Sequence, residues 1–449
     1  MKPYVSYKPS GVPWLGDVPR HWDGKRLRDC VEGCSNGVWG DEPGGGEDDI
    51  PVIRVADFDR DRRRVVEYET VRKVDSSQRG SRGLIPGDML MEKSGGGEQQ
   101  PVGMVVSYLV PEDAVCSNFV ARMRSREGVV SRFMVYLHAY LYASRVTNIS
   151  VKQTTGIQNL DSTAYLSEAC FVPPPDEQQA IADYLDIETA RIDTLIHEKN
   201  ELIGLLREWR QSVIAEAVTK GLDKSAATKP SGVPWLGDVP KHWVGKRLRD
   251  CVEGCSNGVW GDEPDGGDDD IPVIRVADFD RNRRQVVDYE TLRKVDSGQR
   301  GSRGLRPGDM LMEKSGGGEQ QPVGMVVSYF GPEGAVCSNF VARMRSREGV
   351  VSRFMVYLHA YLYASRVTNI SVKQTTGIQN LDSTAYLSEA CFVPPPDEQQ
   401  AIADYLDTEA VKIDDLIDHT HDEITLLKEL RAATIADAVL GRVDVRTKT

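Results

Sequence analysis

The chain repeats itself once with a period of 221 residues, and this repeat limits the possible fold more than any other feature. Residues 8–186 reappear as residues 229–407 with about 13 substitutions in about 179 positions, and from Ala114 to Asp186 the copies are identical. A unit of this length is a whole domain, because solenoid repeats are much shorter and diverge more. The chain therefore contains one fold twice. Recent duplication alone explains the identity, so identity marks no functional site.

Each copy ends in a stretch that predicts one very long helix. The motif PPPDEQQAIADYLD opens it at Pro173 and again at Pro394. The prolines mark a boundary, Asp176 is the expected N-cap, and Gln179 is placed to complete a capping box. Gly221 is the expected C-terminal stop. A helix of this size spans about 66 Å at 1.5 Å per residue, which is long for a helix inside one globular domain.

Apolar residues recur along both stretches at alternating steps of three and four, the heptad pattern of a coiled coil. In the first stretch they are Leu185, Ile192, Ile196, Ile203, Leu206, Val213 and Ala217, and in the second Leu406, Ile413, Ile417, Ile424, Leu427, Thr434 and Ala438. Thr189, Lys199 and Arg210 interrupt the first pattern. The pattern also fits an amphipathic helix packed on its own domain. We favour two helices packed on each other, because the copies diverge after residues 186 and 407 while this seam stays largely apolar.

The chain order is therefore domain, helix, domain, helix. The predicted boundaries are 1–175, 176–221, 222–396, 397–442 and a tail at 443–449. Within each domain, short apolar runs between glycine and proline turns predict strands, and the segment from Val129 to Ser144 has helical spacing. We predict an α+β fold: two mixed α/β domains separated by an antiparallel coiled coil, with a pseudo-two-fold relation between the halves.

Composition places the chain among soluble proteins, with 40% hydrophobic and 27% charged residues. No apolar run approaches the length of a membrane span, and the N-terminus lacks the pattern of a signal peptide. We therefore expect a cytoplasmic protein with no membrane partner. The eight cysteines form C-x-x-x-C pairs without a second close pair or paired histidines, so reduced thiols are expected and a zinc site is not.

Two common catalytic motifs are missing from the sequence. It contains no GxxxxGK[ST] and no HExxH, and its PPPD run lacks the polar and aromatic residues of an amino-methyltransferase motif. The glycine run at Ser94 lacks the Lys-Ser/Thr of a phosphate loop. Asp88, Glu92 and Lys93 resemble a nuclease D…ExK pattern at too short a spacing. An autonomous nuclease with an unrecognised site, and a protein-binding scaffold, remain alternative hypotheses.

Charge is segregated within each domain. The net charge of −13 argues against non-specific coating of nucleic acid. Residues 116–158 nevertheless carry one acid, Glu127, against Arg122, Arg124, Arg126, Arg132, Arg145 and Lys152. Such cations neutralise phosphates, and the Gln and Asn side chains in the loop that follows can pair with adenine edges. The segment favours DNA binding, with a solvated basic strand and an ordinary polar loop as the alternative.

The residues also match a family. The chain resembles the specificity subunit of type I restriction–modification systems over nearly its whole length. The resemblance rests on SGVPWLGDVP-x-HW, L-x-PGDMLM, NISVKQTTGIQNL and PPPDEQQAIADYLD, each present twice, and on VTKGL after the first helix. It implies two target-recognition domains that each read one half of a split DNA site, spaced by an antiparallel coiled coil.

The resemblance also implies the partners. The specificity subunit of this family has no active site, binds double-stranded DNA and docks two modification subunits, which carry S-adenosylmethionine and methylate adenine. Two restriction subunits, which use ATP and Mg²⁺, can join them. We therefore expect a non-catalytic chain with no metal site and no cofactor of its own. The recognition domains of this family usually differ, whereas these are nearly the same, so we predict an interrupted palindrome as the target.

Two loops in each domain, together with nearby Asn and Arg side chains, are the predicted DNA contacts. In the first copy the residues are Lys93, Ser94, Gln99, Gln100, Asn118, Arg122, Lys152, Gln153, Thr154, Thr155, Gln158 and Asn159. In the second copy they are Lys314, Ser315, Gln320, Gln321, Asn339, Arg343, Lys373, Gln374, Thr375, Thr376, Gln379 and Asn380. Arg122 is assigned to phosphates and the amides to base edges.

Overall fold

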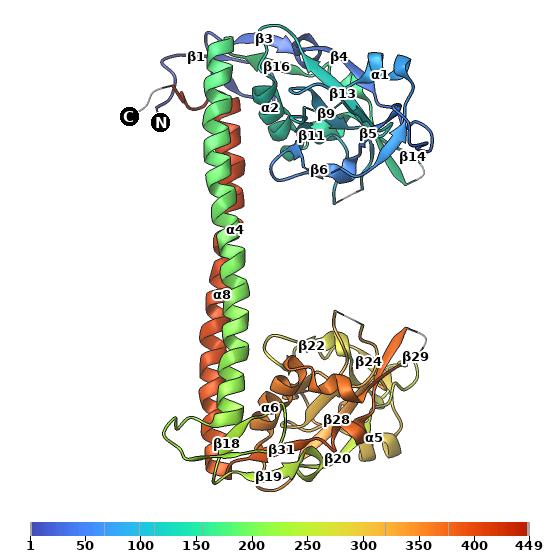
Figure 1. Ribbon diagram of the computed structural model, residues 1–449, viewed down its shortest axis with the longest axis vertical. Helices are drawn as coiled ribbons and strands as arrows, with labels where there is room; N and C mark the ends of the chain where they lie inside the picture. The colour runs from blue at the N-terminus through green and yellow to red at the C-terminus, as the bar shows by residue number, and fades with distance from the viewer. Residues whose placement is uncertain are drawn as a thin grey trace. The chain divides into compact units, whose positions relative to one another are not determined.

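The computed structural model describes residues 2–66, 68–97, 99–111, 113–154, 156–318, 320–375 and 377–446 (Figure 1). It divides into two compact units. The first consists of Met1–Lys199 together with Asp422–Thr449, and the second of Asn200–His421. Each unit contains one repeat domain and a segment of both long helices. The first unit is therefore discontinuous in sequence, whereas the second is continuous.

The long helices are α4 (Pro175–Lys220) and α8 (Pro396–Val439). Pro175 occupies the first helical position, where its missing N–H costs no intrahelical bond. The predicted N-cap at Asp176 is therefore wrong, because this residue lies within the first turn. The predicted capping box is not formed either, since the Gln179 Nε2 donates to Asp183 Oδ1 at 2.8 Å. Gly221 follows the last helical residue with a φ of 74°, which confirms it as the stop.

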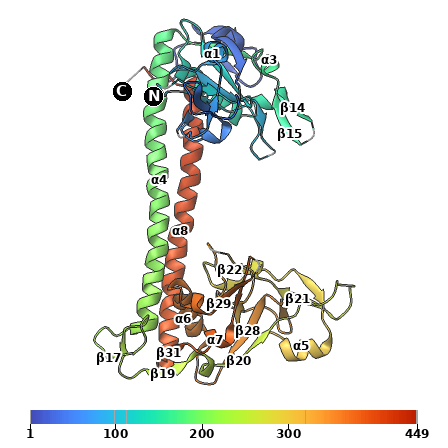
Figure 2. The same cartoon turned by 45° about the vertical axis from the view of Figure 1, so that its right-hand side comes forward.

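The two helices run antiparallel within each unit (Figures 1 and 2). In the first unit Asp193 of α4 pairs with Arg431 of α8 at 2.9 Å, and Lys199 pairs with Glu423 at 2.5 Å. The residue number rises on one helix as it falls on the other. In the second unit Arg210 of α4 pairs with Asp414 of α8.

The predicted seam lies between the helices. Buried seam residues are Leu185, Ile192, Ile203, Leu206 and Ala217 of α4, and Leu406, Ile413, Ile417, Ile424 and Ala438 of α8. Ile196, Val213, Leu427 and Thr434 are half-buried. Burial of this stripe confirms the antiparallel coiled coil that the heptad pattern predicts.

A six-stranded sheet forms the centre of each repeat domain. In the first unit the order is β4 (Val31–Asn36), β13 (Val120–Ser125), β9 (Met89–Glu92), β11 (Val105–Ser107), β7 (Arg64–Val65) and β6 (Phe58–Asp59). Its pairs are antiparallel except for β11 with β7. The second unit repeats the order with β20 (Val252–Asn257), β28 (Val341–Ser346), β25 (Met310–Glu313), β26 (Val326–Ser328), β23 (Gln285–Val286) and β22 (Phe279–Asp280).

Smaller sheets surround the central one. In the first unit they are β1 (Tyr7–Pro9) with β2 (Asp17–Pro19); β3 (Asp23–Arg26) with β16 (Ala169–Val172); β12 (Val115–Cys116), β5 (Asp49–Ile53) and β8 (Val71–Lys73); and β10 (Ser94–Gly95), β15 (Ile157–Leu160) and β14 (Val151–Thr154). Their counterparts are β17 (Thr228–Pro230) with β18 (Asp238–Pro240); β19 (Val244–Arg247) with β31 (Ala390–Val393); β24 (Leu292–Lys294), β21 (Asp270–Ile274) and β27 (Val336–Cys337); and β29 (Val372–Thr375) with β30 (Ile378–Leu381).

Short helices complete each domain. They are α1 (Ser76–Arg82), α2 (Ser131–Ala143) and α3 (Ser162–Tyr165) in the first unit, and α5 (Ser297–Arg303), α6 (Ser352–Ala364) and α7 (Ser383–Tyr386) in the second. The 3₁₀ turns are Leu27–Cys30, Val55–Asp57 and Val146–Ser150, and Leu248–Asp250, Val276–Asp278 and Val367–Ser371. The helix predicted between residues 129 and 144 is α2, which packs against β11.

The core of the first unit joins its repeat domain to both long helices. Trp22, fully buried, donates from Nε1 to Glu177 Oε1 of α4 at 2.9 Å. Ile181 of α4 and Leu440, just beyond α8, lie in the same core as Phe133 of α2. All eight cysteines are free thiols. None of the helices in the described ranges has the length and apolar content that crossing a bilayer requires.

Candidate nucleic-acid interface

The two predicted loops of the first domain meet in one three-stranded sheet. Ser94 of β10 pairs with Asn159 of β15, and Gly95 pairs with Gln158. Strand β14 adds to the other side of β15, where Lys152 pairs with Asn159. Residues about 60 positions apart in sequence thus share one surface. The glycine run allows this, because Gly95 adopts a φ of 125° that side chains other than hydrogen rarely permit.

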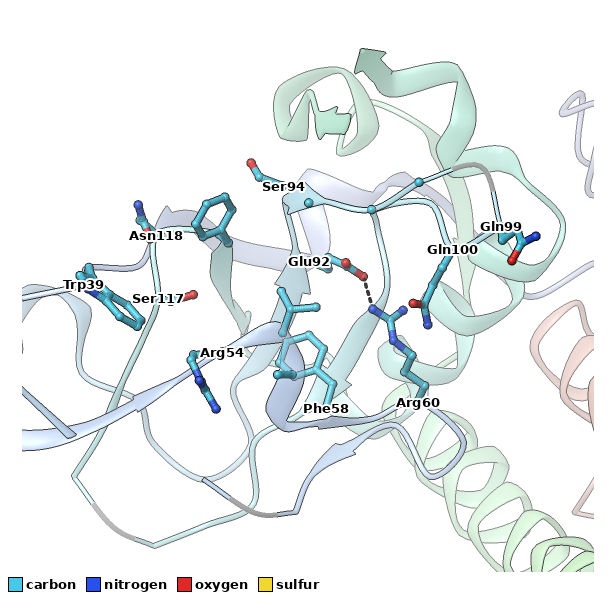
Figure 3. A pocket seen from close by; sticks show the side chains of 16 residues that line it. Trp39, Arg54, Phe58, Arg60, Glu92, Ser94, Gln99, Gln100, Ser117 and Asn118 are labelled. Carbon is cyan, nitrogen blue, oxygen red and sulfur yellow. Dashed lines mark hydrogen bonds and ion pairs between the residues drawn. The ribbon is translucent and has the colours of Figure 1, made fainter. Parts of the chain in front are cut away.

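A cleft of about 1180 Å³ opens beside this small sheet (Figure 3). Its lining combines aromatic rings with loop backbone and amides: Trp39, Phe58 and Phe119; Ser94, Gly95, Gly96 and Gly97; and Asn118, Gln99 and Gln100. Flat apolar rings beside amide groups are the surface that stacks on bases and hydrogen-bonds their edges. The arrangement suits a nucleic-acid ligand.

The second unit carries the same cleft, with a volume of about 600 Å³. Trp260, Phe340 and Asn339 line it, together with Ser315 and Gln321 of the glycine-rich loop. Every lining residue of the second cleft has an identical counterpart 221 positions earlier in the lining of the first. The roughly 13 differences between the copies all lie elsewhere, so both units present one chemistry.

Three of the predicted residues hold the loops to the domain. Lys93 Nζ donates to Asn36 Oδ1 at 2.7 Å, and Ser94 Oγ donates to Asn159 Oδ1 at 2.5 Å. Lys152 Nζ lies 2.8 Å from Asp161 Oδ2, with most of its side chain exposed. These bonds recur at the same distances, within 0.1 Å, for Lys314, Ser315 and Lys373. The loops are thus ordered by side chains of the repeat itself.

The predicted amides differ in exposure. The exposed amides of the first copy are Gln99, Gln100, Asn118, Gln153 and Asn159. Gln158 is only 8% exposed, and its Oε1 accepts a bond from the Val102 N–H at 3.3 Å. Gln158 therefore stabilises the end of the glycine-rich loop from inside the domain. The second copy repeats this pattern. Its exposed amides are Gln320, Gln321, Asn339, Gln374 and Asn380, and Gln379 is buried.

Two predicted contacts per copy are described only in part or not at all. Thr154 and Thr375 are the last residues of β14 and β29. Thr155 and Thr376 lie outside the described residues.

Arg122 lies in β13 with its guanidinium turned onto the backbone. Nη1 donates to the Gly83 carbonyl at 2.7 Å and Nη2 to the Ser81 carbonyl at 3.3 Å. Arg343 bonds the Gly304 carbonyl in the same way at 2.8 Å. These bonds fix the end of α1 and α5, a structural task that the sequence did not reveal. A phosphate contact by Arg122 stays a prediction.

The cleft contains two arginines that the sequence reasoning did not single out, Arg54 and Arg60, and Glu92, which it named only in the nuclease-like pattern. Arg60 Nη2 pairs with Glu92 Oε2 at 3.0 Å (Figure 3). Glu92 is 2% exposed; burial raises the pKa of its carboxyl, and Arg60 opposes this effect. Arg54 and Phe58 also line the cleft, just after strand β5. The strand β5 ends at Ile53, and the break in apolar alternation at Arg54 is the signal that was available.

The same contacts bear on the nuclease hypothesis. Asp88 accepts two bonds of 2.8 Å from Arg124, while Glu92 pairs with Arg60. Each carboxylate is thus matched to its own arginine, which favours a structural role for both. Within the described ranges, no group of three His, Cys, Asp or Glu residues could hold a metal ion.

Comparisons with known proteins give consistent relatives, although no family model matches the chain. It is 20% identical over 404 residues to the type I restriction enzyme StySPI specificity subunit of Salmonella potsdam, covering 88% of this chain and 83% of the relative. It is 20% identical over 405 residues to the EcoKI specificity subunit of Escherichia coli K12, with the same coverage.

Two solved structures share the fold. A chain from a study of complex assembly and conformational transition of a type I restriction–modification system aligns with a TM-score of 0.70 at 16% identity, covering 95% of this chain and 99% of that one. The HsdS subunit of Thermoanaerobacter tengcongensis aligns with a TM-score of 0.54 at 17% identity, covering 95% and 98%. In sequence and in fold the chain is therefore similar to the specificity subunits of type I restriction enzymes.

Proposed function

We propose that this chain reads DNA through the two matched clefts and their adjoining loops, and directs modification by partner subunits to the site. One observation carries the proposal: the lining residues of the second cleft are all identical to those of the first. Two copies of one reading surface should recognise two copies of the same short base sequence.

The proposed target is an interrupted palindrome. The chain order with antiparallel helices predicts a pseudo-two-fold relation between the copies, and duplex DNA has matching two-folds perpendicular to its axis. Copies so related read the same bases on opposite strands. Half-site centres about 10–10.5 base pairs apart put both words on one face of the duplex. The site is then a short word, a gap of several base pairs, and the inverse complement of the word.

Apolar residues on the long helices support the binding of protein partners. Leu205 of α4 and Leu426 of α8 occupy equivalent positions and are 62% and 63% exposed. Trp209 and Leu430, one turn further along each helix, are 46% and 54% exposed. Exposed apolar patches of this kind mark interaction sites. We assign them to two modification subunits, one for each half of the chain.

The division of labour follows from this assignment. The chain supplies DNA recognition and no chemistry, while S-adenosylmethionine binds to the modification subunits. Restriction subunits, with ATP and Mg²⁺, would complete a cutting complex. Arg60 paired with Glu92, and Arg124 paired with Asp88, favour this reading over an autonomous nuclease.

Methylation mapping tests the proposal. Long-read sequencing of cells that carry this chain with a modification partner should reveal one methylated adenine motif with inverse-complementary halves. Two unrelated words, or a direct repeat of one word, would refute the symmetric arrangement. The purified chain alone, with DNA and Mg²⁺, should show salt-dependent binding without cutting or methylation, and cutting would favour the nuclease alternative.

A further inference from the structure

A short arginine-rich turn links β6 to β7 in the first unit and β22 to β23 in the second. We call residues 59–64 and 280–285 the arginine turns. Their sequences are DRDRRR and DRNRRQ, and both carry a net charge of +2. The two differences between them, at Asp61 and Arg64, remove one charge of each sign. The charge of the turn is therefore the same in both copies although its residues are not.

Each arginine turn borders a cleft in its own unit, lined also by α4 and α8 in the first unit and by α4 in the second. The cleft of the first unit has a volume of about 490 Å³ and that of the second about 400 Å³. Arginines supply much of the lining: Arg62, Arg63, Arg64, Arg132 and Arg431 in the first, and Arg207, Arg210, Arg281, Arg284 and Arg366 in the second. We call these the arginine clefts.

Left-handed backbone conformations coincide with these arginines. Among the described residues, the non-glycine residues with positive φ are Arg63, Arg145, Arg284 and Arg366, at 51° to 61°. Arg284 and Arg366 line the same cleft. Arginine gains nothing from this conformation, which glycine and asparagine adopt at lower cost. Strain of this kind concentrates at functional sites.

Among the described residues, neither Arg63 nor Arg284 forms an ion pair. Their Nε and Nη1 atoms are enclosed and have no hydrogen-bond partner among the described residues. Burial lowers the pKa of each guanidinium to about 10, and the neighbouring Arg431 and Arg210, respectively, lower it further. Enclosed donors without an acceptor are costly, so an acceptor from outside the chain would stabilise them.

The acids of the first cleft are already used by other arginines. Asp193 pairs with Arg431, and Asp186 pairs with Arg132. The described lining of the second cleft includes no acid, and two of its arginines have partners outside the lining: Arg281 pairs with Glu313 at 2.9 Å and Arg210 with Asp414. Positive charge is thus left over at Arg63 and at Arg284.

The second arginine cleft adjoins the candidate reading cleft. Arg281 lines both, and Gln320 of the glycine-rich loop lines the arginine cleft. A duplex read by that loop would bring its backbone close to the arginine turn. Phosphodiester oxygens are the acceptors that arginine binds best in a polyanion.

We propose that each arginine cleft binds one phosphate of the DNA backbone, through Arg63 in the first unit and Arg284 in the second. This site rests on the proposed function, since it needs DNA on the reading face. It anchors the duplex without reading sequence.

The test uses the Arg63→Asn and Arg284→Asn double variant of the full chain in complex with its modification subunits. Asparagine suits the left-handed backbone, so the thermal midpoint should stay equal or rise. Each lost contact should lower the slope of log affinity against log salt by about 0.9, which is close to a tenfold loss at 0.1 M salt. Base preference should not change. The control is Arg28→Asn with Arg249→Asn, which removes the same charge outside both clefts and should leave the slope unchanged.

Single methylphosphonate linkages locate the contact. Scanned through one half-site, a neutral linkage at the bound phosphate should weaken binding of the wild-type complex and not of the variant. Inorganic phosphate provides the second arm: if it raises the thermal midpoint of the wild type while no linkage shows the effect, the cleft binds free phosphate and the DNA assignment is overturned.

Two further results would overturn the inference. A variant with the salt slope of the control would show that the clefts hold no phosphate. A variant of lower thermal stability would show that these arginines serve the fold. If the wild-type complex itself fails to bind DNA by sequence, the proposed function fails instead.

Discussion

Arg431 of α8 donates from Nε to Asp193 of α4 at 2.9 Å, and its Nη2 bonds the carbonyl of Asp61 in the arginine turn. Arg210, which lies 221 positions earlier, pairs with Asp414 and donates to the Asn282 carbonyl at 3.2 Å. One arginine in each unit thus joins both helices to the turn of the repeat domain. The polar interruption of the seam at Arg210 therefore has a structural purpose.

Replacing Arg431 should lower the free energy of unfolding of the first unit. Arg431→Met removes the ion pair and leaves Asp193, with 18% of its side chain exposed, without its partner. We expect a loss of about 2–3 kcal/mol, measured as a drop of several degrees in the calorimetric transition of the first unit. Arg191→Met removes a 3.7 Å pair with Glu188 from an arginine whose side chain is 72% exposed, and should cost under about 0.5 kcal/mol. Equal effects of the two variants would contradict the anchoring role.

The seam between the helices predicts a position-dependent effect of charge. Ile413 is 1% exposed, whereas Val411, two residues earlier on the same helix, is 60% exposed. Ile413→Asp should cost roughly 3–4 kcal/mol, because an unpaired carboxylate enters the interface. Val411→Asp should change stability by about 0.5 kcal/mol or less. Thermal melting of both variants checks this, and an unaffected Ile413→Asp chain would remove the seam assignment.

Base reading should be separable between the half-sites. Gln153 is exposed on β14, and Gln374 holds the equivalent place on β29. Gln153→Ala should relax discrimination at one base pair in one half-site, by about 1–3 kcal/mol for a bidentate contact. Gln374→Ala should relax the mirror position in the other half.

Methylation mapping of each variant measures this effect. The matched control is Gln78→Ala on α1, an amide outside the cleft lining, which should leave the motif intact. Relaxation in both halves from a single substitution, or no relaxation in either, would exclude the assignment of these glutamines to base reading.

Two buried histidines predict acid sensitivity. His138 is fully buried, with Nδ1 2.6 Å from the Tyr165 hydroxyl, and burial lowers its pKa to about 4; His359 repeats this arrangement with Tyr386. In the unfolded chain a histidine titrates near 6.5. Since the unfolded state takes up the proton first, stability falls as pH drops from 6.5 towards 4.

The expected loss is about 2 kcal/mol per histidine between pH 7 and pH 5. Denaturant unfolding at both pH values measures it in the wild type and in His138→Gln with His359→Gln. The variant should lose correspondingly less stability over that interval. Identical pH dependence of the two chains would show that these histidines do not control it.

Features of short range were predictable from the sequence. The heptad pattern located the paired helices, because burial of one stripe leaves a local signature. The segments at Ser94 and Gln153 were recognisable by their polarity and glycines, but they were predicted as loops and instead form the short strands β10 and β14. The N-cap was misplaced by two residues, because Asp176 is a strong capping residue while Pro175 is equally at home in a first turn.

Contacts between distant segments were not predictable. Arg60 and Glu92 lie 32 positions apart, and nothing near either residue marks the pair. In the sequence Arg122 looks available for a phosphate. Its hydrogen bonds go to the backbone carbonyls of Ser81 and Gly83, and backbone acceptors cannot be recognised from residue types. Trp39 reaches the cleft under Arg72, whose guanidinium lies 5.0 Å from the ring centroid. Tertiary packing decides such cases.

The discontinuity of the first unit has a consequence for the order in which the protein matures on the ribosome. Ile435, Ala438 and Leu440 belong to the core that surrounds Trp22. The first unit therefore cannot complete its core until its C-terminal residues have been synthesised. The second unit, Asn200–His421, has all its core residues as soon as His421 has emerged from the ribosome. Folding during synthesis should finish in the second unit before the first. A nascent chain stalled before Ile435 would expose an unfinished apolar surface around Trp22, and release of the C-terminus would close it.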